Sequence, residues 1–398
     1  MNVLVYVPYL YNTAPGQRFR LEQWAKLLES KGVNFHFVPF ESEILNRIWH
    51  KQDHYVRKVT ELLRSIFRRL DALKLARNGW DIAIVHRELL PIGPAILERF
   101  LSRKGIPMLY DFDDAIFLPD VSDANRRFRW LKCPKKTGMI CRLSTHTIVG
   151  NEYLKAYALQ YTDRVSVIPT TIDTDHYVPK AHVDIDGLAV IGWSGSLTTL
   201  KHLRWIEPAL KALHRVKPFR LKVIGAERYR SEDLDVDCKP WSAEREVADL
   251  QSFDIGIMPL PDDTWAKGKC GLKALQYMAV GVPTVASPVG VNQEIVRDGH
   301  NGFLASTHTE WVEKLSHLLE DQKLREEFSR EGRRTVEQKY SAKIQAHRFL
   351  TLLEQILRET DDTTKFCFAP PSAGVCCRQT VAVRLAVGDP AGGGVAEF

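Results

Sequence analysis

Short apolar runs alternate with amphipathic helical stretches along most of this chain, and the whole pattern starts again near its middle. The first series of apolar runs lies at residues 3–7, 34–40, 81–86, 107–111 and 145–149. The second series lies at residues 188–192, 219–224, 255–258 and 284–286. Strands separated by helices in this way are typical of a parallel sheet covered by helices on both faces. We therefore predict an α/β fold made of two Rossmann-like, doubly wound domains that face a central cleft.

The length of the chain, 398 residues, is sufficient for two cores of this kind. Proline, aspartate and histidine interrupt the regular pattern between the two series, and we place the domain boundary there. Helical periodicity ends before the last part of the chain, which we expect to be disordered. The predicted units are an N-terminal domain at residues 1–170, a C-terminal domain at 171–345, a closing helix at 346–362 that crosses back, and a tail at 363–398.

Composition narrows the classes of protein to consider. No apolar run approaches the ~20 residues that span a bilayer, and the apolar first residues are expected to form a buried strand rather than a signal peptide. The seven cysteines are odd in number and lack the spacing of a zinc site or a disulfide framework. Thiols of this kind are typical of a reducing compartment, so we expect a cytoplasmic protein.

The most informative segment is a glycine turn that opens a helix. Gly268 and Gly271 permit a tight turn, and the helical pattern begins directly after them. Unpaired amides and the positive end of the dipole make a helix start suitable for phosphate. Lys269 and Lys273 add positive charge, and Gln276 is expected to reach a ribose hydroxyl. The alternative is an ordinary glycine-bounded helix with Lys273 and Gln276 on its surface.

This segment also carries a family resemblance. Residues 277–286 read YMAVGVPTVA, and the segment resembles the donor-binding motif of the family 4 retaining glycosyltransferases, which have the GT-B fold. That family has two glutamates eight residues apart across the turn, where this chain has Gly268 and Gln276. The residue that replaces the first glutamate stays open, with Asp262, Asp263 and Lys269 as candidates. The donor site implied by the resemblance includes Lys269, Gly271, Leu272, Lys273 and Gln276.

A glycine- and serine-rich turn follows the first strand of the second series. Ligands of open α/β sheets bind at the carboxyl ends of strands, so we also assign Gly192, Ser194, Gly195 and Ser196 to the donor site. The resemblance implies an arginine and a lysine for the diphosphate nearby. Lys201 fits the lysine, whereas Trp193 stands where arginine is common. The alternative is a tight turn without a ligand.

Polar residues after three strands of the first series are predicted to form the N-domain side of the cleft. Gly16, Gln17 and Arg18 follow the first strand and are predicted to lie at the acceptor side. His86, Asp113 and Asp114 follow two later strands, and acids this close together at a strand end tend to be functional. The predicted catalytic residues are Asp113, Asp114, His86 and Lys273. Helix capping or a pair with Arg87 is the alternative for the acids.

The resemblance implies a mechanism as well as a fold. In a retaining enzyme of this family the departing diphosphate itself takes the acceptor's proton, so the protein positions the reactants and stabilises charge. We find no acid pair or His/Cys cluster of metal-binding type, and we predict no metal and no cofactor besides the nucleotide diphosphate sugar, which is a co-substrate.

Two basic clusters in the first half, at residues 46–77 and 126–142, bear on partners. The helix in the first cluster has an apolar stripe and an arginine-rich face. We expect the stripe to pack on the core with the basic face in solvent, or the helix to attach to anionic lipid. No nucleic-acid recognition motif accompanies either cluster, so nucleic acid is not an expected partner.

The function implied by the resemblance is transfer of a sugar, with retention, from a nucleotide diphosphate sugar to a glycan or lipid-linked acceptor. Cell-surface polysaccharide or glycoconjugate synthesis is the expected setting, with the enzyme cytoplasmic and peripheral at the inner face of the membrane. Two alternatives stay open. One is a non-catalytic partner subunit of the same fold, which the missing first glutamate suggests, and the other is a nucleotide-sugar epimerase.

Overall fold

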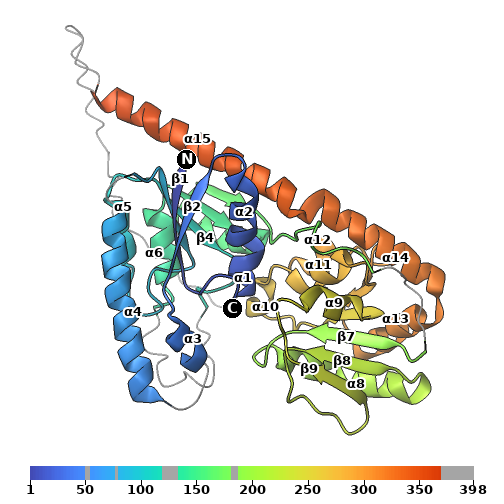
Figure 1. Cartoon of the computed structure of the whole chain (residues 1–398). Coiled ribbons are helices and arrows are strands. Elements are labelled where there is room, and N and C mark those ends of the chain that lie inside the picture. Colours follow the sequence, from blue (N-terminus) through green and yellow to red (C-terminus); the bar gives the residue numbers. More distant parts are fainter. Residues whose placement is uncertain (50–53, 77–78, 119–132, 181–186, 369–398) are drawn as a thin grey trace, which may run out of the picture.

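Two lobes lie side by side in the computed structural model, which describes residues 1–49, 54–76, 79–118, 133–180 and 187–368 (Figure 1). Each lobe contains a six-stranded sheet, with strand order β2-β1-β3-β4-β5-β6 in the N lobe and β12-β11-β10-β7-β8-β9 in the C lobe. All the strand pairs in both sheets are parallel. The prediction of two doubly wound domains is therefore confirmed.

The central strands of the N lobe are buried along their whole length, because helices cover both faces of a parallel sheet. The strands are β1 (Asn2–Val7), β2 (Asn34–Pro39), β3 (Ile82–His86), β4 (Met108–Phe112), β5 (His146–Val149) and β6 (Val165–Val167). The helices are α1 (Pro15–Gln17), η1 (Arg18–Glu22), α2 (Gln23–Glu29), α3 (Glu43–Trp49), α4 (Tyr55–Leu75), α5 (Ile96–Ser102), α6 (Lys136–Leu143) and α7 (Glu152–Ala158).

The C lobe repeats the arrangement with shorter outer strands. Its strands are β7 (Val190–Ser194), β8 (Arg220–Ile224), β9 (Asp235–Lys239), β10 (Ile255–Met258), β11 (Thr284–Ala286) and β12 (Phe303–Leu304). Its helices are α8 (Leu200–Val216), α9 (Glu246–Gln251), α10 (Thr264–Lys267), α11 (Leu272–Ala279), α12 (Asn292–Ile295), α13 (His308–Glu320), α14 (Gln322–Thr335) and η3 (Val336–Tyr340). The sequence did not predict β9, a half-exposed edge strand with charged residues that mask the apolar alternation.

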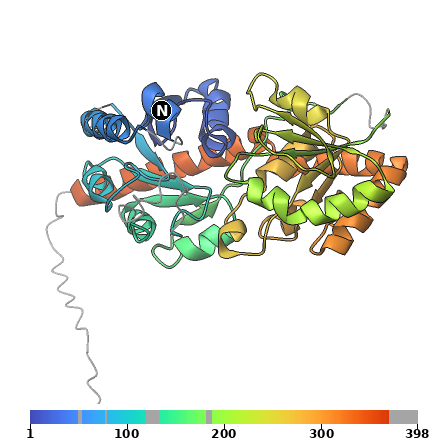
Figure 2. The same ribbon diagram turned by 90° about the horizontal axis from the view of Figure 1, so that it is seen from below.

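The last helix, α15 (Ala342–Phe368), runs along both lobes (Figures 1 and 2). Phe349 packs on Trp24 of α2 with ring centres 5.0 Å apart, and Leu353 and Ile356 join the apolar core of the N-lobe sheet. The predicted crossing helix is confirmed, although it begins at Ala342 rather than at residue 346. It also continues through 363–368, which we had assigned to the tail; the rest of that tail, 369–398, lies outside the described residues.

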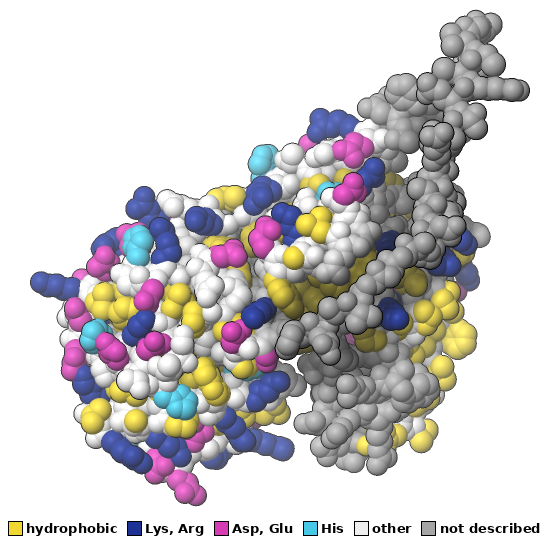
Figure 3. Space-filling model, turned by 180° about the vertical axis from the view of Figure 1, so that it is seen from behind, with side chains coloured by type: hydrophobic (Ala, Val, Ile, Leu, Met, Phe, Trp, Pro, Cys, Tyr) yellow, Lys and Arg dark blue, Asp and Glu magenta, His cyan; other side chains and the backbone are white. Residues whose placement is uncertain are grey.

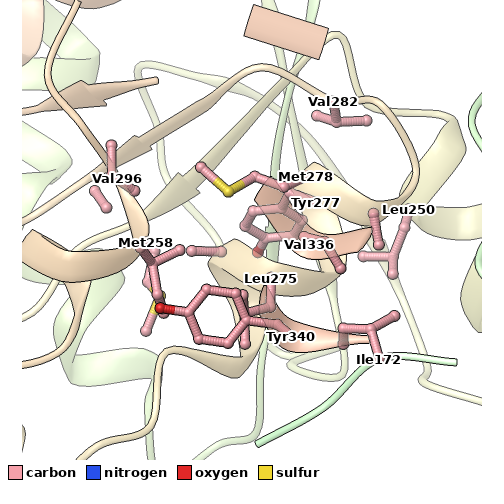
Figure 4. Packing of buried hydrophobic residues seen from close by; sticks show 14 of the residues in the cluster. Ile172, Leu250, Met258, Leu275, Tyr277, Met278, Val282, Val296, Val336 and Tyr340 are labelled. Atoms are coloured by element: carbon pink, nitrogen blue, oxygen red, sulfur yellow. The ribbon is translucent and has the colours of Figure 1, made fainter. Parts of the chain in front are cut away.

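Helix α11 is fixed in the C lobe by its apolar side. Figure 4 shows Leu275, Tyr277 and Met278 packed among residues that include Val336 and Tyr340 of η3. All three α11 side chains are fully or almost fully buried. This packing gives the start of α11 a definite position relative to the sheet.

Helix α4 has the opposite orientation to the one expected. Most of its apolar stripe faces outward, so the prediction that the stripe packs on the core is wrong for all but its C-terminal end, where Leu73 is buried in the N-lobe core. Arg69 points inward instead, and its guanidinium donates to the backbone oxygens of Val7 (2.7 Å) and Val38 (2.8 Å). Two carbonyl groups near the ends of β1 and β2 thereby receive hydrogen bonds from a charged donor. An apolar side chain at this position could not donate these bonds.

The second basic cluster is only partly within the described residues, because 126–132 lie outside them. Within the described part, Lys136 is buried and donates to the backbone oxygen of Leu90 (2.6 Å), with the Glu98 carboxylate 3.4 Å away. The guanidinium of Arg142 lies 5.1 Å from the ring centre of Tyr161. Lys136 is thus part of the internal structure of the N lobe and is not a surface cation.

Candidate active site

The end of β7 and helix α11 are tied together at the carboxyl edge of the C-lobe sheet. The hydroxyl of Tyr277 accepts a hydrogen bond from the amide of Ser194 (2.9 Å) and lies 3.3 Å from its Oγ. Burial raises the pKa of the Tyr277 phenol to about 12, so this group stays neutral and keeps both contacts. The two predicted donor-site segments are therefore neighbours in the fold.

The start of α11 is uncovered. Gly271 holds a φ of +69°, and no side chain caps the helix. A Cβ at Gly271 would lie 2.2 Å from the Ile295 side chain, so the position requires glycine. The amides of Leu272 and Lys273 donate to no protein acceptor among the described residues. An uncovered helix start of this kind binds anions through its free amides and its dipole.

The turn before α11 needs one correction. We had expected free amides from residue 268 onward. The amides of Gly268 and Lys269 instead donate to the backbone oxygens of Trp265 (3.1 Å) and Ala266 (3.0 Å), where they close the end of α10. The free amides therefore begin only at the first residues of α11.

The ammonium group of Lys273 lies 4.8 Å from the ring centre of Trp193, the last but one residue of β7. It forms no ion pair within the described parts of the chain. Burial, and then the nearby Lys269, lower the pKa of Lys273 to about 7. An ammonium group without an ion pair next to uncapped helix amides favours binding of an anion.

Further basic groups surround the same place. His202 is buried, and its pKa is lowered to about 4 by that burial and by the field of Lys273, Lys201 and Lys269. Lys201, at the beginning of α8, is exposed and has no carboxylate partner among the described residues. Sequence reasoning missed His202, which has no motif to mark it. The positive charge at this edge of the C lobe is locally unbalanced, as a diphosphate site requires.

The Gly/Ser turn after β7 supports the site rather than supplying free amides. Gly195 donates its amide to the backbone oxygen of Ile224 (2.9 Å), and Ser196 donates its amide to the Thr199 hydroxyl (3.0 Å). Gly192 is buried within β7, where a Cβ would lie 2.0 Å from the ring of Phe253. The expectation that these amides and Gly192 approach a phosphate is not supported, since each has a protein neighbour.

Gln276 does not face open space. It is buried, and its side-chain amide donates to Glu246 of α9 (3.2 Å). Glu246 also accepts hydrogen bonds from Tyr177 (2.5 Å) and Trp241 (2.9 Å). Although burial alone would raise the pKa of Glu246, the Arg18 guanidinium and the other donors hold it below its usual range. Sequence reasoning missed Glu246, because it did not predict helix α9.

Glu246 also joins the two lobes. Arg18, which we had placed at the acceptor side, donates to its carboxylate at 2.8 and 3.5 Å and also bonds Asn12 (2.9 Å). Gln17 is buried beneath it, with its side chain bonded to the backbone of Tyr9 and to Glu22 (2.6 Å). Gln17 therefore braces the loop after β1, whereas Arg18 lies at the boundary between the lobes.

Asp113 follows β4 on the N-lobe side of this boundary. The Arg87 guanidinium donates to its Oδ1 at 2.8 and 3.0 Å. Burial alone would raise the pKa of Asp113, but Arg87 and other nearby cations hold it well below its usual range, so the carboxylate stays ionised. A Cβ on Gly16 would lie 2.2 Å from Asp113 Oδ2, so the loop after β1 approaches this acid only because residue 16 is glycine.

Asp114 contacts the C lobe directly. Lys269 donates to its two carboxylate oxygens at 2.9 and 3.1 Å, and the Cys270 thiol donates to the backbone oxygen of Asp113 (3.1 Å). The amide side chain of Asn151, after β5, donates to the backbone oxygen of Lys269 (3.0 Å). The turn before α11 is thus held against the ends of β4 and β5.

The remaining candidates for the missing glutamate are both engaged elsewhere. Asp263 caps α10 by accepting from the amide of Ala266 (2.7 Å), and Asp262 pairs with Lys267 (3.1 Å). Neither carboxylate lies free beside α11. Lys269, the third candidate, pairs with Asp114 of the N lobe.

His86 lies behind the site, not in it. Its side chain is fully buried at the end of β3, with Nδ1 2.7 Å from Asp111 Oδ2, and Asp111 in turn pairs with Arg20. A side chain with no exposed surface cannot contact a substrate in this arrangement. We correct its predicted catalytic role to support of the strand ends that carry Asp113.

No cluster of three or more His, Cys, Asp or Glu side chains suited to a metal ion occurs among the described residues. None of the described helices combines the length and apolar character needed to cross a membrane.

Comparison with known proteins places this arrangement in a family. A family model described as glycosyl transferases group 1 matches residues 189–321, within the C lobe. A D-inositol 3-phosphate glycosyltransferase of Paenarthrobacter aurescens is 33% identical over 305 residues, which are 69% of this chain and 73% of that protein. The chain belongs to the glycosyl transferases group 1 family. A protein of the same name from Stackebrandtia nassauensis is 27% identical over 189 residues, and that match spans 42% of its length.

Solved structures of GT-B glycosyltransferases share the fold. Sucrose-phosphate synthase from Thermosynechococcus elongatus superposes with a TM-score of 0.68 and 14% identity, over 90% of this chain and 99% of that one. The Anabaena HepE protein, solved with UDP and glucose, superposes with a TM-score of 0.64 and 14% identity, over 89% of this chain and 100% of that one. This member of the group 1 family therefore has the GT-B fold.

Proposed function

We propose that this group 1 glycosyltransferase moves a sugar from a nucleotide diphosphate donor, with retention, to a glycan or lipid-linked acceptor. The observation that carries the proposal is the ammonium of Lys273, which has no ion-pair partner in the described parts of the chain and stands at the uncovered start of α11. Family membership and the similarity to relatives named as glycosyltransferases support the reaction class.

The diphosphate of the donor would lie at the start of α11. Its oxygens would accept hydrogen bonds from the free amides of Leu272 and Lys273, and the ammonium groups of Lys273 and Lys201 would balance its charge. Members of the resembling family often have an arginine at the position of Trp193. In this chain Lys273 rests on the Trp193 ring, so the cation comes from α11 instead of β7.

The ribose would be held by Gln276 together with Glu246. The family's glutamate at this point is a glutamine here, and Glu246 places a carboxylate 3.2 Å from its amide. Each carboxylate oxygen can accept only a few hydrogen bonds. Among the donors to Glu246 that the structure describes, Arg18 comes from the other lobe. Separation of the lobes would release Arg18 and free the carboxylate for a ribose hydroxyl.

The sugar would lie between α11 and the end of β4. Asp113 is ionised and faces this boundary, so it would accept a hydrogen bond from a sugar hydroxyl and stabilise positive charge that develops on the ring. Asp114 and Lys269 would hold the lobes in register through their ion pair. The departing diphosphate would receive the acceptor's proton, so no enzymatic nucleophile is required.

The acceptor would approach from the loop that contains Gly16 and Arg18. Relatives are named for transfer to inositol 3-phosphate and to a dolichol-linked glycan, and we propose an acceptor of the glycan or lipid-linked class. We also propose that the reaction needs no metal, because lysine ammonium groups and helix amides supply the positive charge at the diphosphate. Full activity in excess EDTA would support this, and activity restored only by a divalent cation would overturn it.

A donor screen followed by a transfer assay tests the proposal. Nucleoside diphosphates and their sugars that bind should raise the melting temperature in proportion to concentration. NMR of the product formed from the best donor should then show the anomeric configuration of that donor. Binding without transfer to any acceptor would favour the partner subunit, and conversion of the nucleotide sugar without an acceptor would favour the epimerase.

A further inference from the structure

Helix α4 presents large apolar side chains to solvent at the outer edge of the N lobe, away from the C lobe (Figure 1). The exposed fraction is 85% for Val56 and 65% for Phe67. Apolar side chains recur along the same side of the helix at three- and four-residue spacing: Val56, Val59, Leu63, Phe67 and Leu70. Figure 3 shows yellow apolar side chains along this edge of the molecule, at the right of the view.

A row of cations borders the apolar side chains. Arg57, Arg64 and Arg68 lie on the exposed part of the helix, about a quarter turn to a third of a turn from the centre of the apolar side. Arg64 pairs with Glu61 at 2.6 Å and Arg68 donates to the Ser65 hydroxyl at 2.7 Å, whereas Arg57 has no ion pair among the described residues. The one exposed acid on α4, Asp71, is paired with Lys74 at 2.6 Å. The exposed side of α4 is therefore half apolar and half cationic.

The contacts on the inner side fix this orientation. Arg69 donates to two backbone oxygens of the sheet edge, and Glu61 accepts from the Ser42 hydroxyl at 3.2 Å. Lys58 and Ser65 are buried on the same side. If α4 turned its apolar side toward the core, these polar side chains would lose the hydrogen bonds that they make there. That loss disfavours the rotation, so the fold itself keeps the apolar side exposed.

We propose that this side of α4 docks on an anionic membrane surface, with Phe67 and Leu63 in the interface and the arginines against lipid phosphates. Charge complementarity favours this occupant. In a contact between two copies of α4 the arginines would meet no free carboxylate, because Asp71 is already paired and Glu61 faces inward. The surface is separate from the donor site and would hold the acceptor-side lobe next to lipid.

Sedimentation with lipid vesicles tests the proposal on the full chain. The protein should bind vesicles of phosphatidylcholine with phosphatidylglycerol at low salt, and bind vesicles of phosphatidylcholine alone at least tenfold more weakly. Phe67→Ser should weaken binding about tenfold, and Arg57→Gln about fivefold. Val216→Ser is the matched control, since Val216 is 69% exposed at the end of α8 in the other lobe, and it should change nothing.

The melting temperature of each variant shows whether it is folded, and exposed positions should leave it unchanged. The proposal is overturned if the protein ignores anionic vesicles at low salt, or if Phe67→Ser binds as wild type. It is also overturned if Phe67→Ser instead abolishes a dimer seen by analytical ultracentrifugation, because the surface would then belong to a second copy of the chain.

Discussion

The ammonium group of Lys273 lies 4.8 Å from the ring centre of Trp193, and this contact joins the first turn of α11 to the end of β7. An aromatic ring attracts a lysine ammonium group and positions it, but the ring carries no net charge and does not neutralise the ammonium. Trp193 thus occupies the β7 position at which the resembling family often has an arginine, and Lys273 of α11 provides the positive charge. A ligand with two phosphates would provide negative charge opposite this ammonium group.

Donor binding should depend on pH in a way that reports on Lys273. In the free protein its pKa is about 7, lowered by burial and by Lys269, and a bound diphosphate would raise it. Above pH 7 binding must therefore take up a proton, so affinity for a nucleoside diphosphate should fall as pH rises, by up to about tenfold per unit. Calorimetry at several pH values measures this.

The nucleotide itself cannot cause such a fall, because its terminal phosphate gains negative charge as pH rises through about 6. Lys273→Met should remove the pH dependence. A wild-type affinity that stays constant or rises between about pH 7 and pH 9 would show that Lys273 does not pair with the diphosphate.

Exchange of Glu246 and Gln276 should be tolerated better than either change alone. Gln276→Glu would place two carboxylates at the distance of the present 3.2 Å hydrogen bond, which disfavours ionisation of both. Donor affinity and melting temperature should both fall. The double variant Glu246→Gln/Gln276→Glu restores one acid and one amide, and a double-mutant cycle should show a coupling of about 1–3 kcal/mol. Additive effects would mean that the two side chains do not act as a pair.

Asp113→Asn should separate catalysis from donor binding. The amide keeps one acceptor oxygen for Arg87 but removes the negative charge that faces the sugar, so turnover should fall about 100-fold. The shift in melting temperature produced by a nucleoside diphosphate should remain, because the proposed site for that ligand lies in the C lobe. Asp163→Asn, at an exposed position of the N lobe, serves as the control. An Asp113→Asn enzyme with unchanged turnover would remove this acid from the mechanism.

Arg69→Met should destabilise the N lobe without affecting donor binding. The change leaves the backbone oxygens of Val7 and Val38 without their charged donor, and we expect a loss of about 2–3 kcal/mol in the free energy of unfolding. Arg57→Met, at an exposed position on the same helix, should cost less than about 0.5 kcal/mol. Equal effects of the two substitutions in urea titrations would contradict the buried role of Arg69.

The sequence predicted the sheets well, because fully buried parallel strands such as β10 and β11 are continuous apolar runs between turn residues. It also located the start of α11 from its glycines. It could not predict the direction of α4, because an apolar stripe on a helix does not show whether the core or another surface covers it. Arg69 decided that direction through backbone oxygens that periodicity does not reveal.

Other parts of the site depend on contacts between distant segments. Arg18 and Glu246 are far apart in the sequence and meet only when the lobes come together. His86 was misassigned for a similar reason: its place at a strand end was correct, but the Asp111 and Arg20 side chains that enclose it come from other elements. Strand ends locate a site, whereas burial decides which of its residues can reach a ligand.

The most direct measurement is a calorimetric titration of wild type and Lys273→Ala with a nucleoside diphosphate and with the same nucleoside without phosphates. Lys267→Ala is the matched control, since Lys267 lies in the same turn but pairs with Asp262 at the surface. We predict that wild type and Lys267→Ala prefer the diphosphate at least 100-fold, and that Lys273→Ala loses most of this preference, about 2–3 kcal/mol. A Lys273→Ala protein that keeps the full preference would contradict a diphosphate site at the start of α11.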